Sequence, residues 1–518
     1  MKYKFKAKPM DISSGEKNAV VLHKEDAEEL NLSGMDRVKV TRDGQEEIAI
    51  IDLTEQQLEK GTVGTFSTLT KQLDIEEGEQ INLIPIDKPR SIEYIKKKLR
   101  GKELEEKETN QIIEDVVKDK LSDIEMTAYI TSLYTRGMTE KESIDFTKAI
   151  VNTGETIKPK SRKVVDKHCI GGVPGNRTTM LIVPIIAASG LKIPKASSRS
   201  ITSPAGTADA MEVLAPVTHP IKKINKIIND VNGCIIWGGA IDLASADDKL
   251  IRVRDPLDID PKGVLLGSIL GKKKAAGATH VLIDIPIGKG AKVENREKAE
   301  ELAEDFMSLG TKLNMEIHCI ITPGYDPVGS AVGPALEARE TLKILEGENV
   351  SKDLKEKSLR MSGLALEIGG KVKKGEGYQE AKKILESGKA KEKMKEIIEA
   401  QGGNPDIKPE DIEIGEHSKE ITADKEGRIQ YLHTNDIAEI GKIAGAPKDK
   451  GAGIYLEVEK GDNIKKGNKL MTIYAESERK LESALKEYRK REPLEMEKVI
   501  LDEYTTEKKP NVKKFKVG

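Results

Sequence analysis

Lys167-His-Cys-Ile-Gly-Gly-Val-Pro-Gly-Asn-Arg177 joins an expected strand at 163–166 to an expected helix at 178–188. The same order of strand, loop and helix then recurs, with further strands expected at 195–197, 234–237, 281–285 and 317–321. Strands that alternate with helices are typical of an α/β domain whose sheet is mostly parallel. This stretch therefore predicts the fold class of the central part of the chain.

The chain changes character on both sides of this stretch, which predicts a multidomain α/β protein. We expect a small β-barrel-like domain at 1–86, a helical domain at 91–160 plus about 245–276, the α/β domain at 161–244 plus 277–404, and an α+β domain at 405–518. Within the first part, residues 30–40 resemble residues 73–83, so either a repeated strand–helix–strand unit builds a pseudo-symmetric barrel or two surface turns are alike by chance.

Two capping boxes mark helix starts in the helical domain. Ser122 is followed by Glu125, and Thr139 is followed by Glu142, at the three-residue spacing that lets each pair satisfy free backbone N–H groups. In the last part, the alternating apolar residues Ile454, Leu456 and Val458 need a partner surface, so we expect this segment to pack on the α/β domain.

The composition excludes several classes of function. Among 518 residues the formal net charge is -2, whereas a dedicated nucleic-acid or membrane-surface protein needs a surface of one sign. Aromatic residues make up 3%, too few for base-stacking platforms, and no apolar run reaches the roughly 18 residues of a membrane span. The three cysteines form no CxxC pair that would suggest a zinc site. A cytoplasmic enzyme without a metal is the expectation.

The first glycine loop could bind an anion. Gly171 and Gly172 allow backbone N–H groups to approach a negative charge, the helix that follows adds its dipole, and Lys167 adds a full positive charge. The alternative is an ordinary turn between a strand and a helix, and the pattern is neither a Walker A motif nor a clean dinucleotide fingerprint. His168 could act as an acid or base, or could be structural.

The next expected strand ends in a loop rich in hydroxyl groups. Open α/β sheets bind ligands at the carboxyl ends of their strands, and hydroxyls with an arginine suit phosphate groups. The alternative is a solvated Ser/Thr-rich loop. The candidate residues are Ser197, Ser198, Arg199, Ser200, Ile201, Thr202, Ser203 and Thr207.

A third group of candidates follows about fifty residues later. Asp260 precedes Pro261, so it either caps a helix or donates a proton to a leaving group. Arg254, Ser268 and Lys272 could share one side of that region, although Lys272 could equally be solvated. Lys292 adds positive charge after a later strand, where a solvated lysine is again the alternative.

These motifs, taken in order, resemble the thymidine and pyrimidine-nucleoside phosphorylase family from about residue 91 to the C-terminus. Three departures from the bacterial enzymes are similar to the archaeal AMP phosphorylases: Cys169-Ile170 after Lys-His, the loop Ser200-Ile-Thr-Ser203, and the extra N-terminal part. That family converts a nucleoside 5'-monophosphate and phosphate into the free base and ribose 1,5-bisphosphate. The resemblance implies that no metal or organic cofactor is needed.

The resemblance also implies roles for individual residues. Asp260 would be the proton donor, while Lys167, Ser197 and Thr207 would hold the attacking phosphate. The remaining implied contacts are to the nucleotide: Gly172, Ser198 to Ser203, Thr207, Ser268 and Lys292. Arg254, Lys272 and His168 are secondary candidates, and Cys169-Ile170 leaves one hydroxyl contact of the bacterial phosphate site in doubt.

Other functions remain open at this point. The chain could be a thymidine or pyrimidine nucleoside phosphorylase, an anthranilate-type phosphoribosyltransferase, or a non-catalytic assembly protein whose N-terminal barrel binds a partner. The second of these uses metal-bound pyrophosphate, and the sequence has no evident acidic metal cluster. For the favoured function we expect nucleoside monophosphate and inorganic phosphate as the partners, no nucleic acid or membrane, a homodimer or larger homo-oligomer, and domains that close over the substrate to exclude water.

Overall fold

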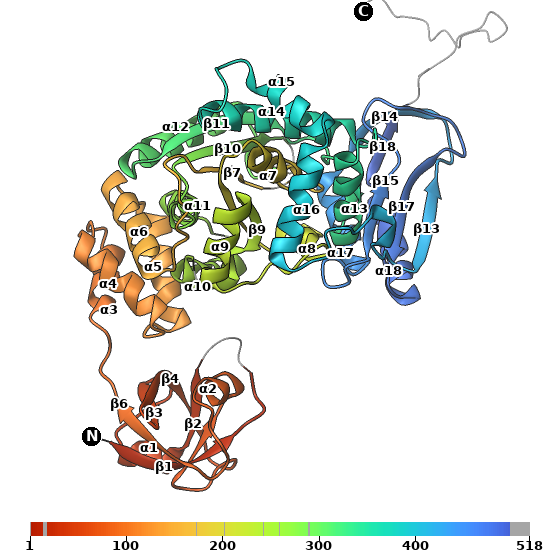
Figure 1. Ribbon diagram of the computed structural model, residues 1–518. Helices are drawn as coiled ribbons and strands as arrows, with labels where there is room; N and C mark the ends of the chain where they lie inside the picture. Colours follow the sequence, from red (N-terminus) through yellow and green to blue (C-terminus); the bar gives the residue numbers. More distant parts are fainter. Residues whose placement is uncertain are drawn as a thin grey trace, which may run out of the picture. The chain divides into compact units, whose positions relative to one another are not determined.

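The computed structural model describes residues 2–13, 18–171, 173–200, 203–241, 243–257, 259–288 and 291–497 (Figure 1). The chain forms two compact units, which we describe separately. Unit 1 comprises Met1–Thr156 and Asp242–Ala275, and unit 2 comprises Ile157–Ile241 and Ala276–Gly518. None of the helices in the described ranges is long and apolar enough to cross a membrane.

Unit 1 begins with a closed six-stranded barrel, in the order β1-β5-β2-β4-β3-β6. Its elements are β1 (Tyr3–Pro9), β2 (Ala19–His23), α1 (Lys24–Glu29), β3 (Arg37–Arg42), β4 (Gln45–Thr54), β5 (Thr62–Thr65), α2 (Ser67–Gln72) and β6 (Gln80–Pro85). The expected repeat corresponds to β2-α1-β3 and β5-α2-β6. Strand β5 is not evident from the sequence, because it has only four residues, one of them glycine.

A bundle of helices completes unit 1. It contains α3 (Ser91–Leu99), α4 (Glu106–Val117), α5 (Asp123–Arg136), α6 (Glu140–Thr153), α10 (Ser245–Arg254), the 3₁₀ turn η2 (Asp255–Leu257) and α11 (Lys262–Ala275). Both predicted capping boxes are confirmed at the starts of α5 and α6. Helix α11 packs closely on α6, because a side chain at Gly267 would begin 2.8 Å from Phe146.

Unit 2 is built on parallel strands that form the sheets β11-β10-β7 and β8-β9 (Figure 1). A bridge between Val164 and Lys192 connects the two sheets. The strands are β7 (Val165–Cys169), β8 (Ile193–Ser197), β9 (Gly233–Trp237), β10 (His280–Ile287) and β11 (Glu316–Pro323), so each expected strand forms, with its ends shifted by up to three residues.

Helices surround these strands and supply most of the apolar core of unit 2. They are α7 (Thr178–Ala188), α8 (Thr207–Glu212), α9 (Ile221–Val231), η1 (Gly238–Ile241), α12 (Arg296–Lys312), α13 (Pro334–Leu345), α14 (Lys352–Ile368), α15 (Gly377–Glu386), α16 (Lys389–Gln401) and η3 (Pro409–Asp411). Helix α7 is buried along its whole length, which explains why its sequence is almost entirely apolar.

The C-terminal part of unit 2 contains two antiparallel sheets, β12-β15-β17-β13 and β16-β14-β18. Its elements are β12 (Ala331–Val332), β13 (His417–Thr422), β14 (Gly427–Leu432), α17 (Thr434–Ile443), β15 (Gly453–Leu456), β16 (Asn463–Ile464), β17 (Lys469–Ala475), α18 (Glu478–Arg491) and β18 (Leu494–Glu497). Strand β12, which comes before α13 in the chain, pairs with β15 through Val332 and Ile454. The C-terminal part is thus joined to the α/β part through β12, but Ile454, Leu456 and Val458 pack mainly in a core of C-terminal residues, to which Val332 contributes, and not on the α/β domain as expected.

Candidate active site

Lys167 is the third of the five residues of β7, which runs two residues further than the expected position of Lys167 just after the strand, and it is almost completely buried. Its Nζ donates a hydrogen bond to Oγ1 of Thr178, at 2.8 Å, in the first turn of α7. Burial lowers the pKa of the ammonium group, while the neighbouring Cys169 and Asp284 act in the opposite direction. Strand β7 thus places a buried cation at the N-terminus of α7, an arrangement that suits an anion.

The glycine loop itself is described except for Gly172, a candidate that falls outside the described residues. Gly171 has a φ of +97°, which favours glycine. A side chain there would begin 4.0 Å from Cε of Lys292, so the exposed Lys292 reaches over this loop. His168 is half-buried on β7. The structure therefore brings Lys167, Lys292 and the loop together.

In the second loop, the guanidinium of Arg199 is held by two carboxylates. Its nitrogens lie 3.1 Å from Asp209 Oδ1 and 2.6 Å from Glu212 Oε1, and it stacks over Trp237 at 4.7 Å. Arg199 lowers the pKa of Glu212 to about 2, with Lys450 adding to this effect. Arg199 thus ties the loop to α8, and its charge is already balanced.

Asp209 holds the shape of the second loop. Its Oδ2 accepts hydrogen bonds from the backbone N–H groups of Ser200, at 2.7 Å, and Gly206, at 2.8 Å. A side chain at Gly206 would begin 2.6 Å from the carbonyl oxygen of Ser198, so only glycine fits there. Thr207 is the first residue of α8 and is half-buried. This fold presents the loop at the end of β8, where a phosphate was predicted.

The remaining candidates in this loop have different surroundings. Ser197 ends β8 and is half-buried, whereas Ser198 is exposed. The hydroxyl of Ser200 donates to the carbonyl of Ser203, and the hydroxyl of Ser203 donates to Ala205 O at 2.7 Å. Ile201 and Thr202 lie outside the described residues.

Arg177 connects the two loops, and sequence reasoning missed it. Its buried guanidinium donates to the carboxylate of Glu337 and to the carbonyl oxygen of Ala205, which precedes Gly206. Burial lowers the pKa of Arg177 to about 10. Its position inside the glycine loop was the one available signal, because Glu337 is 160 residues away.

In unit 1, Asp247 on α10 brings two of the predicted residues together on α11. Its carboxylate accepts a hydrogen bond from Ser268 Oγ and forms an ion pair with Lys272 Nζ at 2.8 Å. Burial lowers the pKa of Lys272, but Asp247 and Asp248 outweigh this effect and raise it. Asp247 is fully buried and was not a candidate, since an aspartate in the first turn of a helix is usually read as a cap.

Asp260 lies shortly before the first residue of α11 and is partly exposed. One of its carboxylate oxygens is 2.6 Å from Nη1 of Arg254, whose side chain is 9% exposed. Arg254 is therefore directed at Asp260, while Ser268 and Lys272 meet at Asp247. The structure thus separates the four predicted residues of this region into Arg254 with Asp260, which are in contact, and Ser268 with Lys272, which are joined through Asp247.

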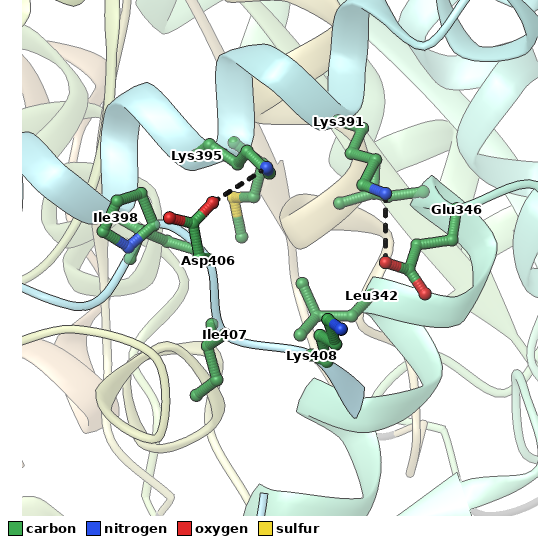
Figure 2. Close-up of a pocket in the computed structure, with 11 residues that line it drawn as sticks. Leu342, Glu346, Lys391, Lys395, Ile398, Asp406, Ile407 and Lys408 are labelled. Atoms are coloured by element: carbon green, nitrogen blue, oxygen red, sulfur yellow. Dashed lines mark hydrogen bonds and ion pairs between the residues drawn. The ribbon is translucent and has the colours of Figure 1, made fainter. Parts of the chain in front are cut away.

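Unit 2 also contains a cavity that none of its candidate residues lines. That cavity, of about 290 Å³, lies among α13, α16 and residues 405–408 (Figure 2). Lys391 pairs there with Glu346 at 3.1 Å, and Lys395 pairs with Asp406 at 3.2 Å. No group of three or more His, Cys, Asp or Glu side chains that could hold a metal ion occurs in the ranges that the structure describes.

Three protein-family models match the chain. The helical bundle domain of a glycosyl transferase family matches 92–154, the a/b domain of that family matches 161–391, and the pyrimidine nucleoside phosphorylase C-terminal domain matches 428–494. AMP phosphorylase 1 of Archaeoglobus fulgidus is 45% identical over 500 residues, which cover 96% of this chain and 99% of that protein. This chain belongs to the AMP phosphorylase family.

Other members of the AMP phosphorylase family match to a similar extent. The AMP phosphorylase of Methanothrix thermoacetophila is 45% identical, with 98% of this chain and 99% of the relative covered. The AMP phosphorylase of Pyrococcus furiosus is 44% identical, with 96% of this chain and 98% of the relative covered. An anthranilate phosphoribosyltransferase from Thermus thermophilus has the same fold over 59% of this chain and 98% of its own, with a TM-score of 0.50 and 19% identity.

Proposed function

We propose that this protein is an AMP phosphorylase, a pentosyltransferase that converts AMP and inorganic phosphate into adenine and ribose 1,5-bisphosphate. The observation that carries this proposal is the similarity to AMP phosphorylases at 45% identity over almost the entire length of both chains. CMP and UMP are further substrates to test. The reaction would serve nucleotide salvage.

In this proposal the first loop holds the attacking phosphate. The buried Lys167 on β7 supplies a positive charge, and the hydroxyls of Ser197 and Thr207 supply hydrogen bonds from the second loop. Charged hydrogen-bond donors bind phosphate more strongly than neutral ones. A phosphate oxygen attacks C1' of the ribose as the bond from C1' to the base breaks, and a phosphate fixed beforehand lowers the entropic barrier to that attack.

The second loop would bind the nucleotide and its 5'-phosphate. We assign this contact to residues 198–203 with Thr207 and Gly172, and we assign further nucleotide contacts to Lys292 and Ser268. Arg199 is held by ion pairs with Asp209 and Glu212, which supports a role in shaping the loop in addition to a role of its charge in binding the nucleotide. A nucleotide carries a 5'-phosphate that a nucleoside lacks, so its binding requires a second set of hydroxyl and backbone donors.

Asp260 is the proposed proton donor to the leaving base. Ribosyl transfer passes through a state with positive charge on the sugar, and the base leaves as a neutral molecule only if it is protonated. A positioned acid contributes about 10²–10⁴-fold to the rate. The adjacent Arg254 supports an ordered carboxyl group, because the two side chains lie 2.6 Å apart.

A single incubation tests the proposed function. The protein is freed of metal with EDTA and incubated with AMP, adenosine or thymidine, with and without phosphate, and free base is measured. We expect base release from AMP only when phosphate is present, with ribose 1,5-bisphosphate as the second product. Release without phosphate would indicate a hydrolase, and cleavage of adenosine or thymidine in preference to AMP would indicate a nucleoside phosphorylase.

The same incubation separates the remaining alternatives. An anthranilate-type phosphoribosyltransferase would need pyrophosphate-activated ribose, anthranilate and a divalent metal, and would leave AMP intact. A non-catalytic assembly protein would release no base under any of these conditions.

A further inference from the structure

Unit 2 contains a group of three side chains, one buried and two half-buried, that the proposed reaction does not use. Asp284 on β10 is fully buried. Its Oδ1 accepts a hydrogen bond from Thr322 Oγ1 at 2.6 Å, and its Oδ2 lies 3.1 Å from Nζ of Lys357 on α14. Lys357 also donates to Thr322 Oγ1 at 3.1 Å. We call these three residues the Asp284 triad.

The strand register places this triad beside the phosphate loop. Asp284 is paired with Cys169 on the neighbouring strand, and the N–H of Ile170 donates to the carbonyl oxygen of Asp284 at 3.1 Å. Paired residues of parallel strands point to the same face of the sheet, and so do residues two positions apart. Asp284, Cys169 and Lys167 therefore share one face.

A buried lysine needs an opposite charge nearby to remain protonated, because burial disfavours the charged form. The titratable groups that act on Lys167 come from four elements: Cys169 on β7, Asp284 on β10, Lys357 on α14 and Arg177 before α7. Of these, Cys169 and Asp284 favour the ammonium form of Lys167, although burial raises the pKa of the Cys169 thiol and so disfavours its thiolate. Lys357 and Arg177 oppose the ammonium form. Asp166, next to Lys167 in the chain, points to the other face of the sheet.

We propose that Asp284 is a positioning residue for the phosphate site: its carboxylate keeps Lys167 charged, and Thr322 and Lys357 hold that carboxylate in place. The inference rests on the proposed function, in which Lys167 binds phosphate. The ion pair between Asp284 and Lys357 weakens the influence of Asp284 on Lys167, because the positive charge of Lys357 cancels part of the negative charge that Lys167 experiences. The triad thus sets the pH above which the site loses its affinity for phosphate.

The test measures the affinity of the full-length protein for inorganic phosphate by calorimetry from pH 6 to pH 10. Asp284→Asn removes the negative charge, so the pH at which affinity is lost should fall by about one unit. Lys357→Gln removes the opposing positive charge, so that pH should rise. Asp284→Glu and Lys357→Arg keep the charges and should stay near the wild-type profile. Glu356→Gln on the same helix is the matched control and should cause no shift.

If the triad were only structural, the substitutions would lower the affinity for phosphate at all pH values and would not shift the alkaline limit in opposite directions. Equal alkaline limits in wild type, Asp284→Asn and Lys357→Gln would overturn the inference. If Asp284→Asn does not fold, as judged by circular dichroism, the comparison of Lys357→Gln with Lys357→Arg decides. Base release from AMP by the wild type is measured in parallel: if it is absent, the proposed function fails, whereas normal release with unshifted variants refutes the triad's role alone.

Discussion

Asp260 illustrates how one side chain can fit two roles. It lies at the start of α11 with its carboxylate 2.6 Å from Arg254, and both the helix N-terminus and the guanidinium favour the ionised form. A proton donor must carry its proton at the moment of transfer. Asp260 can meet this condition only if binding of the nucleotide removes water or if the proton arrives from the bound base.

Replacing Asp260 by Asn separates these roles, because Asn retains the size and most of the capping ability but has no titratable proton. We expect kcat for AMP phosphorolysis to fall about 10²-fold or more, with little change in nucleotide affinity. Steady-state kinetics with AMP and phosphate check this result. Asp255→Asn, at an exposed neighbouring acid, is the control. A nearly normal kcat would make Asp260 a helix cap and His168 the next candidate donor.

Ser200 tests whether the second loop distinguishes a nucleotide from a nucleoside. Its hydroxyl and its backbone N–H both lie within that loop, bonded to Ser203 and Asp209. We expect Ser200→Ala to weaken binding of AMP more than binding of adenosine, because only AMP carries the 5'-phosphate. Calorimetric titration with both ligands measures the difference, and equal losses would remove the loop from phosphate recognition.

Helix α6 combines a local cap with a distant ion pair through Glu142. The carboxylate accepts the N–H of Thr139 at 2.9 Å and also binds the buried ammonium of Lys98 at 2.6 Å. The first contact could be predicted from the capping box. The second could not, since Lys98 is on α3.

Glu142→Ala should therefore destabilise unit 1 far more than loss of a cap. Loss of a helix cap costs about 1 kcal/mol, whereas leaving a buried charge without its partner costs about 3–5 kcal/mol. Denaturant unfolding of Glu142→Ala and of the exposed control Glu140→Ala measures the difference. A loss of only about 1 kcal/mol for Glu142→Ala would show that Lys98 finds another partner or reaches water.

Helix α13 is joined to β12 by a buried carboxyl group. Glu340 accepts the N–H groups of Ser330, at 2.8 Å, and Ala331, at 3.2 Å, and also the hydroxyl of Ser351. Its other oxygen faces Gly329, where a side chain would begin 2.7 Å away. Burial raises the pKa of Glu340 to about 7, despite these hydrogen bonds.

The raised pKa makes stability depend on pH. Between the ordinary pKa of 4.5 and about 7, the folded protein retains a proton that the unfolded chain has lost, so stability falls as pH rises through this range. Glu340→Gln is neutral throughout and should be more stable than wild type at pH 8, by about 1–3 kcal/mol, and similar to it at pH 5. Thermal unfolding at both pH values tests this, with Glu346→Gln as control. A variant less stable at pH 8 would contradict it.

The N-terminal barrel has its own apolar core and is joined to the bundle by an ion pair. Val20, Val38, Val63 and Leu83 are among its fully buried residues. Arg37 in β3, almost completely buried, pairs with Glu125 at the start of α5. The barrel thus adds a contact to the bundle without supplying any of the candidate site residues.

Removal of residues 1–86 should leave a folded protein that still releases base from AMP. The deletion exposes Glu125 and should lower the thermal midpoint or change the oligomer size more than kcat. Light scattering, thermal unfolding and kinetics of the truncated chain measure these three properties. An unchanged oligomer size and thermal midpoint would refute a role for the barrel in assembly or stability.

Much of the fold could be predicted because the signals are local. Capping boxes involve residues three apart, as in Ser122 and Glu125, and the strand and helix periods can be recognised within one segment. The glycine loop and the hydroxyl-rich loop were recognised for the same reason, because each follows directly from its strand. Strand β5 could not be predicted, because four residues are too few to show the alternating pattern of a strand.

Contacts between distant segments had to come from the tertiary structure. Arg177 and Glu337 are 160 positions apart, and Ser268 and Asp247 are 21 apart on different helices, so no spacing rule relates them. The pairing of β12 with β15 likewise depends on the path of the chain. The state of a buried group, such as Lys167 beside Asp284 or Glu340 beside Gly329, depends on which charges and how little water surround it after folding, and that environment exists only in the folded chain.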